Sequence, residues 1–219
     1  QLQLHKNRDD DFHVYRRHIY HAMNKGIAQA HGEYLVFMNS GDCFHDSSVL
    51  EWVAAQKLDV DIAIGTVECV GTGRLKVPPC NDLSMMDLFR NHPPHQAAFI
   101  RRALFEKGGF DESLVLVADW SFFVDRLIFQ HTSYRRLDKI ISDYDMSGLS
   151  TMQTDLLREE RYRVLKAFFP ERVLKDYEKY KYADSPLLEL IPELNRTAGF
   201  HRMVYRLVKF LLRSYHWIG

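Results

Sequence analysis

A helix-forming stretch, a glycine and a short apolar run follow one another early in the chain and indicate the class of fold. Apolar residues recur at three- and four-residue spacing from Tyr15 to His31, which predicts an amphipathic helix. Gly32 stands where a glycine often ends a helix, and the apolar run 33–38 predicts a buried strand. That run leads directly into the polar turn 39–42. A helix, a buried strand and a polar turn in succession are typical of an α/β protein.

The rest of the chain alternates between strands and helices up to about residue 150 and is helical beyond it. We expect strands over 61–65, 97–100 and 133–145, a hairpin over 66–77, and helices over 48–57, 84–90, 102–107 and 119–129. The last three helices are expected over 153–169, 171–182 and 197–217. We therefore predict an α/β fold with two parts: a mixed sheet flanked by helices over residues 1–150, and a C-terminal helical extension over residues 151–219.

Composition narrows the classes of function. The 219 residues carry no net charge, so the overall charge gives no support for a nucleic-acid partner. The three cysteines are odd in number and none has C-x-x-C spacing, which argues against a disulfide framework or a zinc knuckle and favours a reducing compartment. No apolar run reaches the ~18 residues of a membrane-spanning helix, and the first ten residues are polar, unlike a signal peptide. We expect a cytoplasmic protein.

The polar turn 39–42 ends in a carboxylate, Asp42, placed directly after the expected strand 33–38. Ligands of open α/β sheets bind at the carboxyl ends of strands, and a carboxylate on a tight glycine turn there can reach a divalent cation. Mg²⁺ and Mn²⁺ prefer oxygen ligands and typically bridge diphosphate oxygens. The alternative is that Asp42 only shapes the loop or caps the next helix.

A second carboxylate, Asp119, stands between Ala118 and Trp120 at the start of the expected helix 119–129. The helix dipole stabilises an anion at that position. This suits a general base, which must be ionised and within hydrogen-bond reach of an incoming hydroxyl. The alternative is an ordinary N-cap aspartate, which the spacing alone favours.

Histidines form a third group of candidates. His95 and Gln96 precede a short expected strand, and both side chains can bind sugar hydroxyls; the alternative is a loop pair satisfied by the backbone. The pairs His18/His21 and His92/His95 have three-residue spacing. A transition-metal site is not expected from either pair, because the sequence indicates no third ligand.

The end of the chain is basic and amphipathic. Residues 196–219 contain five Lys or Arg and no Asp or Glu. One face of the expected helix 197–217 carries Arg202, Arg206, Lys209 and Arg213, and another carries Phe200, Val204, Leu207, Leu211 and Tyr215. Such a helix can lie on an anionic membrane surface. The alternative is that its apolar face packs on the rest of the protein.

Several of these segments, taken in order, resemble the centre of family 2 glycosyltransferases. The likeness lies in 19–27 (IYHAMNKGI), 32–42 (GEYLVFMNSGD), 95–102 (HQAAFIRR), 108–112 (GGFDE), 118–120 (ADW) and 144–150 (YDMSGLS). It covers roughly residues 15–150. The resemblance implies a GT-A fold and an inverting transfer of a sugar from a nucleotide-sugar donor to an acceptor hydroxyl. The expected acceptor is a glycan or lipid-linked saccharide in lipopolysaccharide, capsule or exopolysaccharide synthesis.

The resemblance also assigns roles to individual residues. Asp42 matches the last carboxylate of the family's metal-binding motif, which would hold Mn²⁺ or Mg²⁺ on the donor diphosphate and neutralise the leaving group. Asp119 matches the catalytic base. The expected donor-binding residues are Asn24, Lys25, Gly26, Ser40 and Gly41. Those expected on the acceptor side are His95, Gln96 and Trp120.

The chain departs from the family pattern at its start. The strand and loop that open the family's fold, and the second strand that ends in aspartate, have no counterpart here, so we expect about fifty residues of the fold to be missing. Close relatives carry Asp-x-Gly-Ile-Tyr-Asp where this chain has Arg16, His18 and His21 in the corresponding places. No histidine near 144–150 matches a further metal ligand. These departures favour an alternative, a non-catalytic GT-A-like domain that binds a saccharide or partner protein; the retained Asp42 and Asp119 favour the enzyme.

Overall fold

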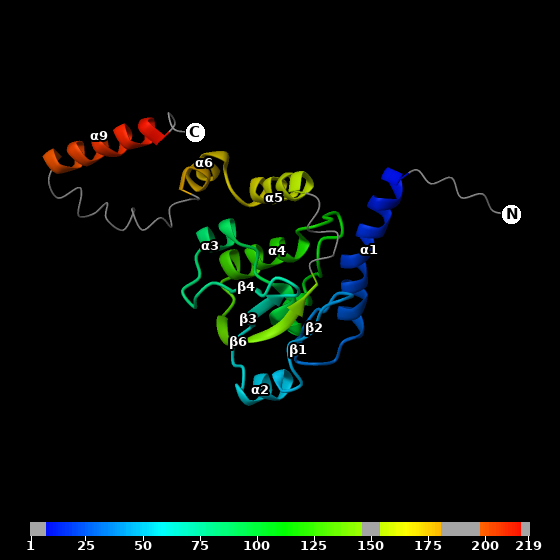
Figure 1. Cartoon of the computed structure of the whole chain (residues 1–219). Helices are drawn as coiled ribbons and strands as arrows, with labels where there is room; N and C mark the ends of the chain where they lie inside the picture. Colours follow the sequence, from blue (N-terminus) through cyan, green and yellow to red (C-terminus); the bar gives the residue numbers. More distant parts are fainter. Residues whose placement is uncertain (1–7, 146–153, 181–197, 216–219) are drawn as a thin grey trace. The chain divides into compact units, whose positions relative to one another are not determined.

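The computed structural model describes residues 8–145, 154–180 and 198–215. The chain divides into two compact units, Gln1–Leu174 and Lys175–Gly219. The first unit begins with α1 (Arg8–Gln29), β1 (Tyr34–Leu35), β2 (Cys43–Phe44), α2 (Val49–Ala55), β3 (Ile62–Cys69), β4 (Arg74–Lys76) and α3 (Met85–Arg90). It continues with η1 (His95–Ala97), β5 (Ala98–Arg101), η2 (Arg102–Phe105), α4 (Ala118–Phe123), the π-helical η3 (Val124–Phe129), β6 (Tyr134–Tyr144) and α5 (Thr154–Phe168) (Figure 1). Helix α6 (Glu171–Tyr180) contains the division between the units, and α9 (Ala198–Tyr215) lies in the second.

The six strands form one mixed sheet in the order β1-β5-β3-β6-β2, with β4 paired to β3. The β3–β6 pair is parallel, and the other pairs are antiparallel. A register shift in the β3–β6 pair surrounds Gly65, where a Cβ atom would meet the side chain of Ile141 at 2.3 Å. Glycine is therefore the residue that allows this close approach. The predicted α/β class with a mixed sheet is confirmed.

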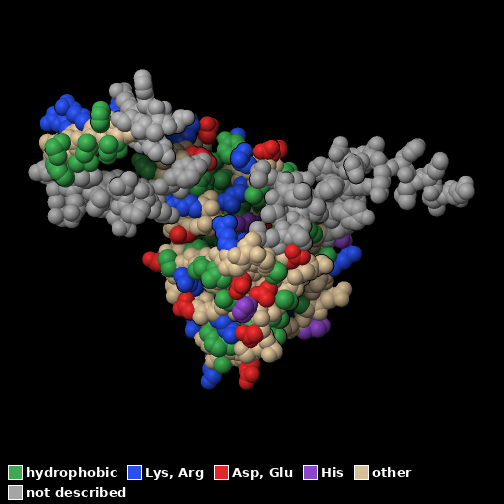
Figure 2. All heavy atoms as spheres, in the orientation of Figure 1, with side chains coloured by type: hydrophobic (Ala, Val, Ile, Leu, Met, Phe, Trp, Pro, Cys, Tyr) green, Lys and Arg blue, Asp and Glu red, His purple; other side chains and the backbone are tan. Residues whose placement is uncertain are grey.

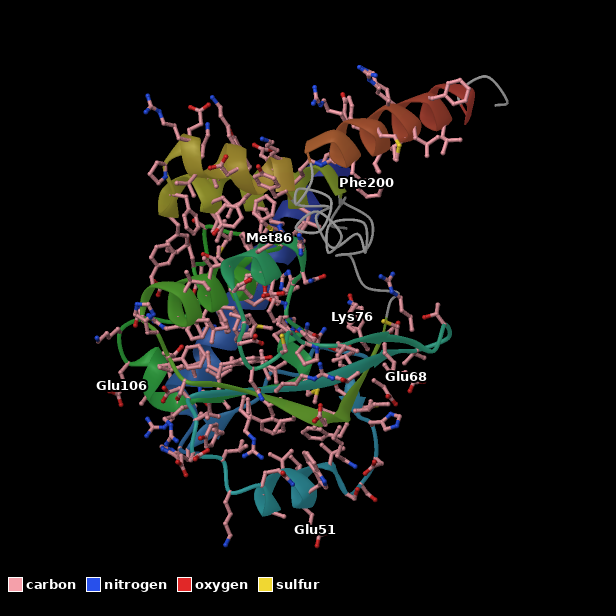
Figure 3. The ribbon with its side chains drawn as sticks, turned by 90° about the vertical axis from the view of Figure 1, so that its left-hand side faces the viewer. Glu51, Glu68, Lys76, Met86, Glu106 and Phe200 are labelled. Atoms are coloured by element: carbon pink, nitrogen blue, oxygen red, sulfur yellow. The ribbon has the colours of Figure 1, made fainter. Side chains whose placement is uncertain are left out.

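Helices cover both faces of the sheet (Figure 3). On one face, Val49 and Val53 of α2 pack against a cluster from the strands that includes Ala63, Leu137 and Ile141. On the other face lie α3 and α4 (Figure 3). Burial of this apolar surface on both sides is the main contribution to stability, at roughly 25 cal/mol per Å².

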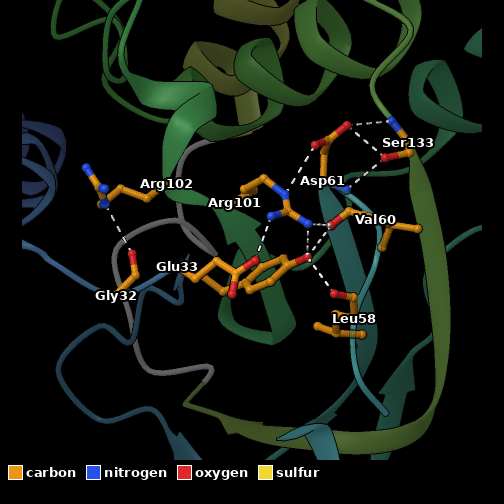
Figure 4. A network of polar contacts seen from close by, with 9 residues as sticks. Gly32, Glu33, Leu58, Val60, Asp61, Arg101, Arg102 and Ser133 are labelled. Carbon is orange, nitrogen blue, oxygen red and sulfur yellow. Dashed lines mark hydrogen bonds and ion pairs between the residues drawn. The ribbon is translucent and has the colours of Figure 1, made fainter.

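At one end of the sheet, where β1, β3 and β6 begin and β5 ends, a network of polar contacts surrounds Arg101 (Figure 4). Its guanidinium donates to Glu33 at 2.6 Å and to the hydroxyl of Tyr34 at 2.8 Å, and it lies 3.4 Å from Asp61. Asp61 in turn accepts a hydrogen bond from the hydroxyl of Ser133 at 2.7 Å. The network therefore connects β1, β3, β5 and β6 at one end of the sheet.

The expected buried strand 33–38 is shorter and more exposed than its apolar sequence suggested. Only Tyr34–Leu35 form a strand, β1, and within the described residues its partner is β5. Residues 34–38 are half-buried. A groove of about 650 Å³ lies against this segment, lined mainly by apolar residues of α1 and of 34–40. The short run therefore lies at the edge of the sheet, where fewer elements cover a strand than at the centre.

Most other expected elements are present with small changes. The expected helix 119–129 is α4 followed by the π-helical η3, and the expected helix 102–107 is the short 3-10 helix η2. The expected domain boundary at 150/151 lies outside the described residues. Within the first unit, helix α5 is held to the segment before α4, because Glu160 accepts hydrogen bonds from the backbone N–H groups of Val115 and Leu116. Within the described residues, no helix is long and apolar enough to span a membrane.

Candidate active site

Asp119 is the centre of a buried polar cluster. Its side chain is 3% exposed, and its oxygens meet three donors from distant parts of the chain. Oδ1 accepts a hydrogen bond from the hydroxyl of Tyr20 at 2.8 Å. Oδ2 lies 2.8 Å from Nε2 of His92 and 2.6 Å from Nδ1 of His95. We call these four residues the aspartate cluster.

Local sequence explains how the two histidines reach Asp119. Helix α3 ends at Arg90, and Asn91 is already extended, with φ −120° and ψ 156°. Pro93 and Pro94 then prevent the helix from resuming, since proline cannot donate the backbone hydrogen bond of a helix interior. The 3-10 helix η1 starts only at His95. This extended segment places both rings on the first turn of α4.

Trp120 holds α4 in position from the other side. The indole is fully buried, and its Nε1 donates to the carbonyl of Leu88 at 2.8 Å. The guanidinium of Arg161 on α5 lies 4.2 Å from the indole centroid and donates to the carbonyl of Phe89 at 2.6 Å. The expectation that Trp120 faces the acceptor is therefore wrong, because a side chain without exposed surface supports the site instead of lining it.

Charges in the aspartate cluster favour the ionised carboxylate. Burial alone would raise the pKa of Asp119, but the neighbouring charges and hydrogen bonds of His92 and His95 hold that pKa well below its usual range. Burial and the adjacent carboxylate raise the pKa of the Tyr20 hydroxyl well above its usual value. At neutral pH the cluster thus contains an Asp119 anion and a neutral Tyr20 that donates to it.

The aspartate cluster is linked to the polar turn 39–42. The amide Nδ2 of Asn39 lies 3.0 Å from Nε2 of His95. Because the carboxylate of Asp119 can only accept, Nδ1 of His95 carries the proton and Nε2 can accept from the Asn39 amide. The turn at the end of the strand segment and the head of α4 therefore belong to one site.

Asp42 holds the shape of this turn. Its Oδ2 accepts from the backbone N–H of Asn39 at 3.3 Å, and its Oδ1 accepts from the backbone N–H of Asp145 at 3.2 Å. Burial raises the pKa of Asp42 against the lowering effect of these bonds. Gly41 has φ +95°, and a Cβ atom there would lie 2.8 Å from Oδ2 of Asp145. The glycine is required for both reasons, and it brings a second carboxylate next to Asp42.

The other residues expected on the donor side do not form a single cluster in the structure. Asn24 clamps the 108–112 loop: its Oδ1 accepts from the backbone N–H of Phe110 at 2.8 Å, and its Nδ2 donates to Glu112 at 2.8 Å. Its amide therefore has a structural role. Gly26 and Ser40 line the groove beside α1, and Lys25 is exposed on α1. Gln96 is buried.

The described residues contain a group that could hold a metal ion, formed by His92, His95 and Asp119. Their potential ligand atoms all lie within 4.8 Å of one another. The expectation that the His92/His95 pair lacks a third ligand is wrong, because Asp119, 24 residues beyond His95, supplies one. His21 pairs instead with Glu112 at 3.0 Å, and the side chain of His18 lies outside those described. Neither His92 nor Tyr20 was expected in the site; the one local signal for His92 was its three-residue spacing from His95, and no local pattern marks Tyr20.

The known proteins to which this chain is similar are glycosyltransferases. The family model "Glycosyl transferase family 2" matches residues 2–110. A PGL/p-HBAD biosynthesis glycosyltransferase of Mycobacterium bovis is 29% identical over 142 residues, which cover 63% of this chain and 55% of that protein. An uncharacterized glycosyltransferase of Mycobacterium tuberculosis is 29% identical over 143 residues, covering 60% and 52%. The chain thus spans about half the length of the curated relatives it matches.

A solved structure shares the fold. The structure of Staphylococcus aureus TarS 1-349 in complex with UDP-GlcNAc superposes with a TM-score of 0.50 and 16% identity, covering 76% of this chain and 54% of that one. The similarity shows the GT-A arrangement that the sequence predicts.

Proposed function

Because the family 2 glycosyl transferase model matches residues 2–110 of this chain, we propose that the chain forms the catalytic part of an inverting enzyme that transfers a sugar from a nucleotide-sugar donor to an acceptor hydroxyl. The observation that carries this proposal is the hydrogen bond between Asn39 and His95, which joins the Asp42 turn to the Asp119 cluster. A transferase needs both: one group to hold the leaving diphosphate and another to receive the acceptor proton. The M. bovis relative is named a PGL/p-HBAD biosynthesis glycosyltransferase, and the TarS structure is a complex with UDP-GlcNAc. The first supports glycosyl transfer, and the second supports a nucleotide-sugar donor.

The donor side centres on Asp42. Its carboxylate is half-buried at the turn, and the Asp145 carboxylate lies against the neighbouring Gly41. Oxygen ligands of this kind fit Mg²⁺ or Mn²⁺. The cation would neutralise charge on the diphosphate as it leaves. Ser40, Gly41, Lys25 and Gly26 would lie beside the donor.

The acceptor side centres on the aspartate cluster. We place the base function at Asp119 together with the histidines bonded to it, with His95 and Gln96 on the acceptor side. The acceptor would be a glycan or a lipid-linked saccharide of the cell surface, used at the cytoplasmic face of the membrane. A hydroxyl of such an acceptor attacks the anomeric carbon in one displacement, which inverts its configuration.

Helix α9 suits a role at that membrane. Its side chains Met203, Leu207, Phe210 and Leu211 are 55–67% exposed, and the helix contains no Asp or Glu. Figure 2 shows hydrophobic side chains in green along one side of α9 and basic ones in blue along another. An interfacial helix inserts such an apolar face while Lys and Arg attract anionic lipid. The side chains of Arg213 and Tyr215 lie outside those described.

The alternative, a non-catalytic domain that binds a saccharide or partner protein, is favoured by one observation. The oxygens of Asp119 are engaged by Tyr20, His92 and His95, as in a purely structural cluster. Such a domain would bind saccharide without needing a nucleotide or a cation.

Calorimetry distinguishes the transferase from the non-catalytic domain. UDP and GDP are titrated into the natural full-length protein with and without Mn²⁺, for the wild type and for Asp42→Asn. The transferase predicts that Mn²⁺ strengthens nucleotide binding in the wild type, and that Asp42→Asn removes the gain. Equal affinity in all four combinations would contradict the role of Asp42, and absence of any nucleotide binding would favour the non-catalytic domain.

A further inference from the structure

Lys76, the last residue of β4, reaches across β3 to the end of β6. The register of the sheet pairs Lys76 with Val67 on one side of β3. On the other side it pairs Tyr144 with Cys69. Paired residues of neighbouring strands share a face of the sheet, and Val67 and Cys69 share one because they are two residues apart. Lys76 and Tyr144 therefore lie on the same face, and the ammonium of Lys76 is 3.8 Å from the centroid of the Tyr144 ring.

This contact places Lys76 beside the turn that carries Asp42. Asp145 follows Tyr144 directly, and its backbone N–H donates to Oδ1 of Asp42 at 3.2 Å. Figure 3 shows Lys76 on the side of the sheet that α3 and α4 cover, and Glu68 on the opposite side. Helix α4 begins with the residues of the proposed base. Lys76 therefore lies on the face of the sheet that holds the candidate site.

The ammonium of Lys76 is not neutralised by the protein. Among the described residues, no hydrogen bond or ion pair reaches it, and its close contact is the Tyr144 ring. Burial lowers the pKa of Lys76, and the charge of Asp42 is one of the influences that oppose this lowering. The residue as a whole remains exposed. Since an ammonium has three N–H donors, those of Lys76 are available to an anionic ligand beside the turn.

We propose that Lys76 binds the diphosphate of the nucleotide-sugar donor beside Asp42 and stabilises it as the leaving group. This inference rests on the proposed glycosyl transfer. The acceptor oxygen forms its bond to the anomeric carbon and gives its proton to the base placed at Asp119. The bond from that carbon to the diphosphate oxygen breaks, and its electron pair stays on the diphosphate. The ammonium keeps its proton and acts as a fixed positive charge near the oxygen that leaves.

The contact with Tyr144 explains how the charge is positioned. A lysine side chain has a flexible four-carbon stem, and its ammonium is strongly hydrated, so a surface lysine is ordinarily mobile. An aromatic face attracts the ammonium and restricts it to one place. Tyr144 is fixed at the end of β6 and is followed by the residue bonded to Asp42, so the charge is aligned with the turn. Lys76 thus adds to the charge of a cation held by Asp42.

The test is calorimetry on the natural full-length protein with Mn²⁺. UDP, GDP, UMP and GMP are titrated into the wild type, Lys76→Met and Lys76→Arg. Methionine keeps an unbranched stem but removes the charge, so Lys76→Met should bind the diphosphates about 10–100-fold more weakly, the usual effect of losing a hydrogen bond to a charged group. The monophosphates lack the phosphate that leaves the sugar and should be affected less. Lys76→Arg keeps the charge and should retain most of the affinity.

Two controls separate this role from a general loss of charge or of structure. Lys166→Met also removes a lysine that lies over a tyrosine ring, that of Tyr162 at 4.6 Å, but on α5. His45→Gln removes a side chain that lies 2.7 Å from Asp143, the residue before Tyr144, which points to the opposite face of β6. Both controls should bind UDP and GDP with the affinity of the wild type.

The possible outcomes distinguish the role of Lys76 from the proposed function. Wild-type affinity in Lys76→Met, an equal loss for diphosphates and monophosphates, or the same loss in Lys166→Met would overturn the proposal. Unchanged binding of UDP and GDP with weaker binding of farnesyl phosphate would assign Lys76 to a phosphate of the acceptor, which also overturns it. If the wild type binds no nucleotide, the proposed function fails and this inference with it. A wild type that binds UDP or GDP beside an unaffected Lys76→Met refutes only the role of Lys76.

Discussion

The aspartate cluster and the turn at 39–42 belong to the same site but are built in opposite ways. The cluster is closed: the Asp119 side chain is 3% exposed, and its hydrogen-bond partners come from α1, from the segment before η1 and from η1 itself. The turn is open: Ser40 and Gly41 are exposed, and the adjacent groove of about 650 Å³ is lined by α1 and by half-buried residues of 34–39. One half is therefore held by tertiary contacts, whereas the other leaves its groups exposed.

This difference suggests how the two halves respond to mutation. Changes in the closed half should affect folding or turnover strongly, because each group there has buried partners. Changes in the open half should be smaller and should appear mainly in ligand binding.

The largest effect is expected for Asp119→Asn. An amide can no longer hold a histidine in its charged form, so kcat should fall about 10²–10⁴-fold while donor affinity changes little. Initial rates and donor titrations on the full-length protein measure the two quantities. A variant that keeps more than half of the activity would show that the closed half has no part in the chemistry.

The next effect concerns stability. Trp120→Ala should lower the free energy of unfolding of this chain by about 3–5 kcal/mol, because it removes a fully buried indole and its hydrogen bond to Leu88. Urea denaturation followed by circular dichroism gives the value. Trp52→Ala is the control, since Trp52 on α2 is only partly buried and should cost less. An equal cost for both would mean that α4 is not anchored through Trp120.

The third prediction concerns the binding of helix α9 to membranes. Replacing Arg202 and Lys209 by glutamine should weaken binding to anionic vesicles roughly 30-fold, since each basic residue near such a surface contributes about 1 kcal/mol. Co-sedimentation with vesicles of anionic and of neutral lipid measures it. Salt should weaken the binding in the same way. Equal binding to neutral vesicles, or no binding at low salt, would indicate that the apolar face of α9 packs on protein.

The smallest effect separates backbone strain from crowding in the open half. Gly41→Ala and Gly71→Ala both place alanine at positive φ, +95° and +81°, but only Gly41 has a neighbour within 4 Å, Asp145. Strain of this kind costs of order 1–3 kcal/mol. We expect Gly41→Ala to be the more destabilising by about 1 kcal/mol. Thermal unfolding of both variants checks the order, and the reverse order would contradict the packing described for the turn.

The sequence predicted those helices and strands whose formation depends mainly on neighbouring residues. The strands β3 and β6 and the helices α2, α3 and α5 lie close to the expected ranges; at α3, Ser84 forms a capping box with Asp87. The segment 33–38 was predicted as buried because its composition is apolar, but the burial of a strand depends on the elements that cover its faces, and these come from elsewhere in the sequence.

The site was predicted in part. Asp42, Asp119 and His95 were identified as candidates, and they belong to one connected site through Asn39. The contacts of Asp119 with Tyr20 and His92 were not foreseen, because they join residues 99 and 27 positions apart. Trp120 was assigned to the acceptor side from the family resemblance, yet its orientation is set by Leu88 and by Arg161 on a helix about 40 residues later.

The most direct test of the account is the stereochemistry of transfer. The natural full-length protein is incubated with Mn²⁺, an α-linked nucleotide-sugar and an octyl glycoside, and the anomeric proton of the product is followed by NMR. The account predicts a β-linked product, formed by the wild type and by His45→Gln but not measurably by Asp119→Asn. An α-linked product, or equal product formation by Asp119→Asn, would contradict a single displacement assisted by the aspartate cluster.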